Sequence, residues 1–74
     1  MTPEQRKKIE ELVASDERLS WDDRHGITVI NRAWGRFYYQ KRYKAWQWSS
    51  YVPLALDHSI LIGQIAQKIK EALA

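Results

Sequence analysis

The chain contains no cysteine, only three glycines and only two prolines among its 74 residues. Without cysteine it can form neither a disulfide bond nor a zinc site with thiolate ligands. A single hydrophobic core in so short a chain contributes roughly 3–5 kcal/mol, so chains of this size often gain stability by self-association. We therefore expect one small domain over residues 1–74 that forms a homodimer.

Acidic residues are absent from the middle of the chain. Residues 1–26 carry five basic and seven acidic side chains, whereas residues 27–52 carry five basic side chains and no acidic one. Residues 53–74 carry two of each. The net charge of +3 therefore originates in the middle segment, which either the acidic N-terminal segment or a negatively charged partner could neutralise.

Long hydrophobic runs are absent as well. The N-terminal residues MTPEQRKKIEE are charged and do not contain the apolar run of a secretory signal. The longest mainly apolar stretch, around residues 60–62, is far too short to cross a bilayer. We expect a cytoplasmic protein that does not associate with a membrane.

The sequence pattern predicts three helices. Thr2 to Gln5 form a capping box with proline at the first helical position, which predicts a short N-terminal helix. Ser20 is the predicted N-cap of a long second helix through the aromatic middle segment. A third helix is predicted after Pro53 from apolar residues at helical spacing. Those apolar residues are Leu54, Leu61, Ile62, Ile65, Ile69 and Leu73.

Residues 27–30, Ile-Thr-Val-Ile, would suit a strand as well as a helix because all four are β-branched. No Asn-Gly, Asp-Gly or proline turn occurs between Ile27 and Tyr51, and this absence favours a helix over a hairpin. We therefore predict an all-α fold, with two long helices in an antiparallel hairpin and a short N-terminal helix. Two such chains are expected to dimerise into a helical bundle.

The middle segment RAWGRFYYQKRYKAWQW, residues 32–48, holds seven aromatic and five basic side chains. On a helix, one face would be apolar, interrupted by Lys41, and would form the core with Ile27, Ile30, Trp34, Phe37, Tyr38, Ala45, Trp48 and Val52. The opposite face would carry the predicted partner-binding residues Arg32, Arg36, Tyr39, Arg42, Tyr43 and Trp46. Tryptophan, tyrosine and arginine dominate protein–protein hot spots, which favours a binding role for this face. Packing of Tyr39, Tyr43 and Trp46 against the first helix or across the dimer is the alternative.

No catalytic, cofactor-binding or metal-binding motif is found in the sequence. Asp57, His58 and Ser59 are consecutive, so on a helix their side chains diverge by about 100° and cannot converge as a catalytic triad. The acids in the run Asp22-Asp23-Arg24-His25 are more typical of a helix start than of a metal site. We expect that the protein is not an enzyme and uses neither a cofactor nor a metal.

These features predict a non-catalytic module that binds a host or other cellular protein and inhibits or modulates it by masking its functional surface. Nucleic-acid binding by the basic aromatic segment 32–48 is the alternative, since cations could hold phosphates while aromatic rings stack on bases. The modest net charge and the absence of a helix-turn-helix, zinc-finger or RNP pattern favour the protein partner.

In size, predicted helix content and the surface formed by Tyr39, Arg42, Tyr43 and Trp46, the chain resembles small phage-encoded host-takeover proteins, of the quorum-sensing anti-activator type. This resemblance implies a dimeric helical protein in the host cytoplasm. It also implies a partner such as a bacterial transcriptional regulator or an ATPase.

Overall fold

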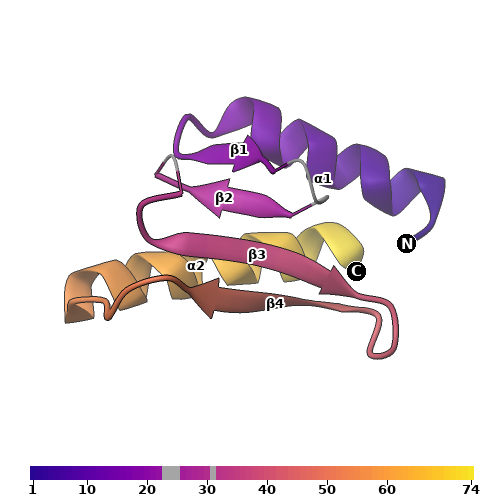
Figure 1. Ribbon diagram of the computed structural model, residues 1–74. Coiled ribbons are helices and arrows are strands. Elements are labelled where there is room, and N and C mark those ends of the chain that lie inside the picture. Colours follow the sequence, from indigo (N-terminus) through magenta and orange to yellow (C-terminus); the bar gives the residue numbers. More distant parts are fainter. Residues whose placement is uncertain (23–25, 31) are drawn as a thin grey trace.

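The fold combines two helices with one antiparallel sheet. The computed structural model describes residues 1–22, 26–30 and 32–74. Along the chain the elements are α1 (Pro3–Ser15), β1 (Leu19–Trp21), β2 (Ile27–Val29), β3 (Gly35–Gln40), β4 (Ala45–Ser50) and α2 (Leu56–Leu73). The strands form a meander in the order β1-β2-β3-β4 (Figure 1). The predicted all-α fold is therefore wrong, and the protein belongs to the α+β class.

The first helix begins where the sequence predicts. Thr2 Oγ1 accepts a hydrogen bond from the Gln5 backbone nitrogen at 3.2 Å, and the Gln5 side chain accepts one from the Thr2 nitrogen at 2.9 Å. This reciprocal pair is the predicted capping box, and it satisfies two amide groups that the first turn leaves without partners. Of α1, only Ile9 and Val13 are fully packed into the core.

The predicted middle helix is instead the three strands β2, β3 and β4. No glycine turn is needed, because β3 and β4 are joined by the four-residue loop 41–44, in which Lys44 adopts a left-handed conformation with φ 51°. Ile30 and Arg32 likewise have positive φ in the connection between β2 and β3. Isoleucine, arginine and lysine residues therefore supply the turn geometry that the sequence analysis expected only from an Asn-Gly, Asp-Gly or proline turn. The β-branched and aromatic residues of this segment suit strands.

The predicted third helix is confirmed as α2, although it begins at Leu56 after a short connection, with Ala55 as N-cap. Three isoleucines of the predicted stripe, Ile62, Ile65 and Ile69, are buried. Ile60 lies off this stripe and is 54% exposed. Neither helix within the described ranges is long and apolar enough to span a bilayer.

Both helices cover the same face of the sheet (Figure 1). Cross-strand pairs place Ile27 opposite Phe37 and Phe37 opposite Trp48, and alternation along each strand puts these side chains on the face that packs against the helices. We call this the helix-covered face. Its buried residues join those of the helices in one core: Ile9, Val13, Leu19, Ile27, Val29, Phe37, Ile62, Ile65 and Ile69.

The other face of the sheet, which we call the open face, has no helix over it. Register and alternation assign to it Ser20, Thr28, Arg36, Tyr38, Gln40, Ala45, Gln47 and Ser49. The predicted core stripe is therefore only partly right. Phe37 and Trp48 do pack with the core, but Tyr38 and Ala45 lie on the open face and Val52 is exposed. A period of two residues, rather than 3.6, decides which side chains are buried.

Candidate functional site

The six predicted partner-binding residues do not share one face, because they lie on strands and loops rather than on a helix. Arg32 lies in the β2–β3 connection, Arg36 lies on the open face, and Arg42 and Tyr43 lie in the β3–β4 loop. Tyr39 and Trp46 are cross-strand neighbours whose ring centroids are 5.7 Å apart, on the helix-covered face.

Two of the predicted anchors are only partly accessible. Tyr39 is half-buried, and its hydroxyl accepts a hydrogen bond from the Met1 nitrogen at 3.5 Å. Trp46 is half-buried too, and its Nε1 atom is buried without a hydrogen-bond partner among the described residues. Both rings therefore lie partly inside the domain. Tyr43, by contrast, is 63% exposed, with the Arg42 guanidinium 5.6 Å from its ring centroid.

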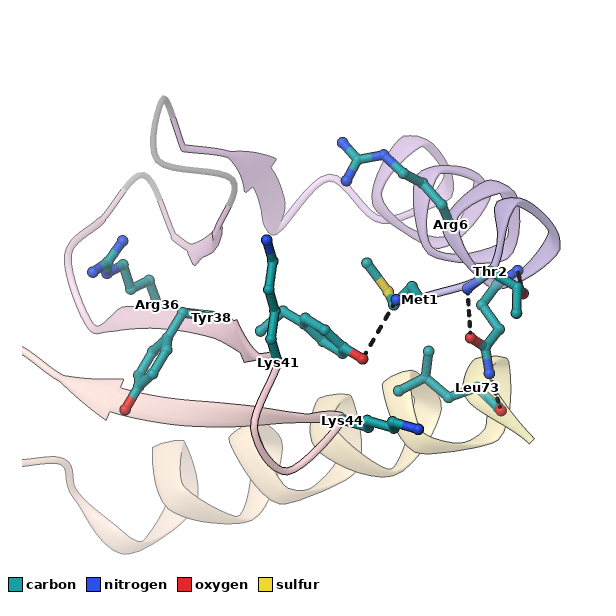
Figure 2. Close-up of a pocket in the computed structure, with 10 residues that line it drawn as sticks. Met1, Thr2, Arg6, Arg36, Tyr38, Lys41, Lys44 and Leu73 are labelled. Atoms are coloured by element: carbon teal, nitrogen blue, oxygen red, sulfur yellow. Dashed lines mark hydrogen bonds between the residues drawn. The ribbon is translucent and has the colours of Figure 1, made fainter.

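A concave cavity of about 960 Å³ lies where the hairpin of β3 and β4 approaches the start of α1 and the end of α2 (Figure 2). The cavity exists because β3 runs three residues beyond its pairing with β2, which ends at Phe37. The edge of β3 from Tyr38 to Gln40 is therefore not paired with β2. The lining residues are Met1, Thr2, Gln5, Arg6, Arg36, Tyr38, Tyr39, Lys41, Lys44 and Leu73.

The lining carries positive charge and no carboxylate. Arg6 comes from α1, Arg36 from β3, and Lys41 and Lys44 from the two ends of the hairpin loop. Figure 2 shows Lys41 extending toward the side of α1 that carries Arg6, while Lys44 extends toward the last turn of α2. We call Arg6, Arg36, Lys41 and Lys44, together with Arg42 of the same loop, the basic surface.

Some cations of the basic surface form ion pairs with carboxylates outside the cavity, and others do not. Arg6 pairs with Glu10 at 3.2 Å on the exposed side of α1, and Arg36 pairs with Asp22 at 3.2 Å. Within the described ranges, no ion pair involves Lys41, Arg42 or Lys44. The hairpin loop therefore carries the charges that are most available to an anionic ligand.

Tyr38 adds an aromatic ring to the open-face side of this site. The Arg36 guanidinium lies 5.7 Å from the centroid of the Tyr38 ring, and the Gln40 side-chain nitrogen donates a hydrogen bond to the Tyr38 hydroxyl at 3.4 Å. Arg36 and Gln40 lie two residues before and after Tyr38, so all three side chains project from the same face of β3. A cation–π contact and a hydrogen bond thus hold this ring in place.

Among the charged and aromatic residues of the lining, sequence reasoning missed four: Arg6, Tyr38, Lys41 and Lys44. Lys41 and Lys44 carry a local signal, since they begin and end the tetrapeptide Lys41-Arg42-Tyr43-Lys44, in which three of the four residues are basic. Tyr38 was assigned to the core because it was placed by helical periodicity. Arg6 lies more than thirty residues away in sequence, and no local pattern connects it to the hairpin.

No cluster typical of a metal site is seen in the part of the chain that the structure describes. There, no three His, Cys, Asp or Glu side chains gather as a metal site would require. His58 lies in the first turns of α2, half-buried and stacked on Trp34 with 4.0 Å between ring centroids. Three residues of the run Asp22-Asp23-Arg24-His25, namely Asp23, Arg24 and His25, lie outside the described residues.

Comparison with protein-family models, with curated proteins and with solved structures found no match to this chain.

Proposed function

We propose that the protein binds nucleic acid through the basic surface. The observation that supports this proposal is that cations from α1, β3 and the hairpin loop surround one concave cavity that has no carboxylate in its lining. Arg6 and Arg36 are paired with carboxylates outside the lining, so Lys41 and Lys44 are the cations that counterions or a polyanion would neutralise. Nucleic acid was the alternative in the sequence analysis, and this arrangement now makes it the better-supported function.

The hairpin loop is the part of the surface best suited to phosphate groups. It presents Lys41, Arg42 and Lys44 within four residues, on the end of the molecule where both chain termini also lie (Figure 1). Lysine serves phosphates as a flexible point charge, and arginine can hold two phosphate oxygens at once. A backbone with regularly spaced phosphates would thus meet several cations without requiring the loop to rearrange.

Fluorescence anisotropy with a labelled mixed-sequence oligonucleotide at several salt concentrations tests the proposal. We expect binding at low salt that weakens steeply as salt rises, because bound phosphates release counterions. Replacing Lys41 and Lys44 together by glutamine should weaken binding and reduce the magnitude of the slope of log affinity against log salt by roughly 1.4–1.8.

The matched control replaces Lys8 and Lys68, two exposed lysines outside the cavity lining, by glutamine. This control makes the same change in net charge and should change affinity far less. The proposal fails if the wild-type protein does not bind at low salt, or if the control weakens binding as much as the hairpin variant does.

Protein binding is the second candidate function, and a different surface supports it. Four large apolar side chains are exposed along the β4–α2 connection and the first turns of α2: Tyr51, Val52, Leu56 and Ile60. Val52 also lines a shallow cavity of about 310 Å³ next to them. Large exposed apolar patches are rare on soluble monomers and often mark sites of protein–protein interaction. We call these four residues the apolar patch.

The apolar patch could bind either a partner protein, whose functional surface it would mask, or a second copy of the chain, as the sequence predicts. Its contact residues differ from those that the sequence analysis predicts. None of the six predicted partner-binding residues belongs to it. The likeness to phage anti-activators, the host partner and the cytoplasmic location stay predictions attached to this second candidate.

A further inference from the structure

We infer that the nucleic acid is bound as a single strand, with a base seated on the open face of the sheet against Tyr38. This inference rests on the proposed function and names the class of nucleic acid that the site would take. Its starting point is the position of Tyr38, which belongs both to the open face and to the lining of the basic cavity.

The open face offers a base the contacts that it needs. Tyr38 is half-buried, and its ring is held by Arg36 on one side and by the Gln40 hydrogen bond on the other. Gln47 is the cross-strand partner of Tyr38, so a second amide lies beside the ring. Amide side chains both donate and accept hydrogen bonds, as the edges of bases do. The strands themselves place no carboxylate on this face, and the nearby carboxylate of Asp22, just after β1, is paired with Arg36 at 3.2 Å.

The phosphate-binding and base-binding parts of the site adjoin directly in sequence and in space. Gln40 is followed by Lys41, and Lys44 precedes Ala45, the cross-strand partner of Gln40. A strand whose base contacts Tyr38 would therefore place its neighbouring phosphates at the start of the hairpin loop. Both kinds of contact are needed for sequence-tolerant binding of single strands.

A duplex could use only half of this site. In double-stranded nucleic acid the bases are already stacked on one another, so an aromatic side chain reaches a base face only after unpairing. The cations would still bind phosphates of a duplex, but Tyr38 and the amides of Gln40 and Gln47 would contribute little. The pairing of an aromatic platform with neutral amides beside the basic surface is what points to a single strand.

The experiment compares single-stranded RNA, single-stranded DNA and the duplex of the same sequence as anisotropy ligands. We expect both single strands to bind more tightly than the duplex, and the ratio of RNA to DNA affinity shows whether the 2′-hydroxyl contributes. Tyr38→Ala should weaken single-strand binding by about 5- to 150-fold, the range for loss of one base–aromatic stack, and should leave duplex affinity nearly unchanged.

Two further variants separate stacking from other effects of the substitution. Tyr38→Phe keeps the ring and should keep affinity within about twofold, whereas Tyr38→Leu keeps apolar bulk without the ring and should behave like Tyr38→Ala. Tyr51→Ala, at an exposed tyrosine outside the cavity lining, is the matched control and should bind normally. Circular dichroism establishes that each variant is folded.

The outcomes distinguish this inference from the proposed function. If the duplex binds as tightly as the single strands, and Tyr38→Leu binds normally while the Lys41 and Lys44 variant does not, the inference is overturned and the proposed function stands. If no nucleic acid binds the wild-type protein at low salt, the proposed function itself fails.

Discussion

The two faces of the sheet differ in composition, although the same strands supply both. On the helix-covered face, Ile27, Val29 and Phe37 are at most 2% exposed. On the open face, the side chains at alternate positions of the same strands are polar, with Arg36 and Tyr38 as the largest. The comparison teaches that a short chain can place core residues and polar residues on opposite sides of one strand, because successive side chains point in opposite directions.

The largest difference between the two faces should appear when adjacent residues of β3 are truncated. Phe37→Ala removes a fully packed ring and should cost about 3–5 kcal/mol of the free energy of unfolding, about the whole stability of a domain of this size. Tyr38→Ala, on the open face, should cost about 1 kcal/mol or less. In circular dichroism, the first variant should be largely unfolded and the second should retain a cooperative urea transition. Equal losses would show that the two faces do not divide these roles.

The same comparison extends to the two sides of α2. Ile65→Ala empties a site with 0% exposure and should cost about 2–5 kcal/mol, whereas Ile60→Ala, at 54% exposure, should cost less than about 1 kcal/mol. Urea unfolding measures both.

Substitutions on the exposed side of α2 should instead affect the association of two copies of the chain. If the apolar patch joins two copies of the chain, light scattering should show the molar mass of the wild type rising toward that of a dimer with concentration. Replacing Leu56 and Ile60 by glutamine should abolish the rise without lowering stability. A wild type that stays monomeric would remove the homodimer from the second candidate function.

The smallest expected effect lies at the junction of α1 and β1, away from both faces. Hydrogen bonds from the Arg18 side chain, at 2.7 and 2.9 Å, lower the pKa of Asp16 from 3.8 to about 2. Because the folded-state pKa is the lower one, this pair stabilises the fold above about pH 4, and the contribution is lost as the pH falls toward 2. With Arg18 37% exposed, the contribution should be about 1 kcal/mol or less.

Urea unfolding of the wild type and of Asp16→Asn at several pH values measures this contribution. The difference in unfolding free energy between the two proteins should shrink as the pH falls through this range. A difference that stays constant with pH would mean that the ion pair does not contribute to stability.

Local sequence signals correctly predicted the two helices, because each helix depends on interactions or spacing among residues that are close in sequence. The capping box of Thr2 and Gln5 joins residues three apart, so it could be identified without knowing the rest of the fold. The stripe of Ile62, Ile65 and Ile69 repeats at the helical period, and it led directly to α2.

The middle segment was misread because its apolar residues satisfy two periods at once. Phe37, Tyr38 and Tyr39 are consecutive aromatic residues, so they can be divided between two faces of a helix as readily as between the two faces of a strand. The choice depended on a turn, and the turn used Lys44 in a left-handed conformation that no sequence rule assigns to lysine. Pairing of β3 with both neighbours, rather than local preference, stabilises that conformation.

By itself, the sequence determined that the net positive charge originates in the middle segment, that α1 starts at a capping box and that α2 buries an isoleucine stripe. Only the tertiary structure decided that Arg6 joins Lys41 and Lys44 around one cavity, and that Tyr38 faces away from the core while Phe37 faces into it. The physical reason is that charge and helical periodicity are properties of neighbouring residues. Which distant residues meet depends instead on strand register and on the packing of both helices against a single face of the sheet.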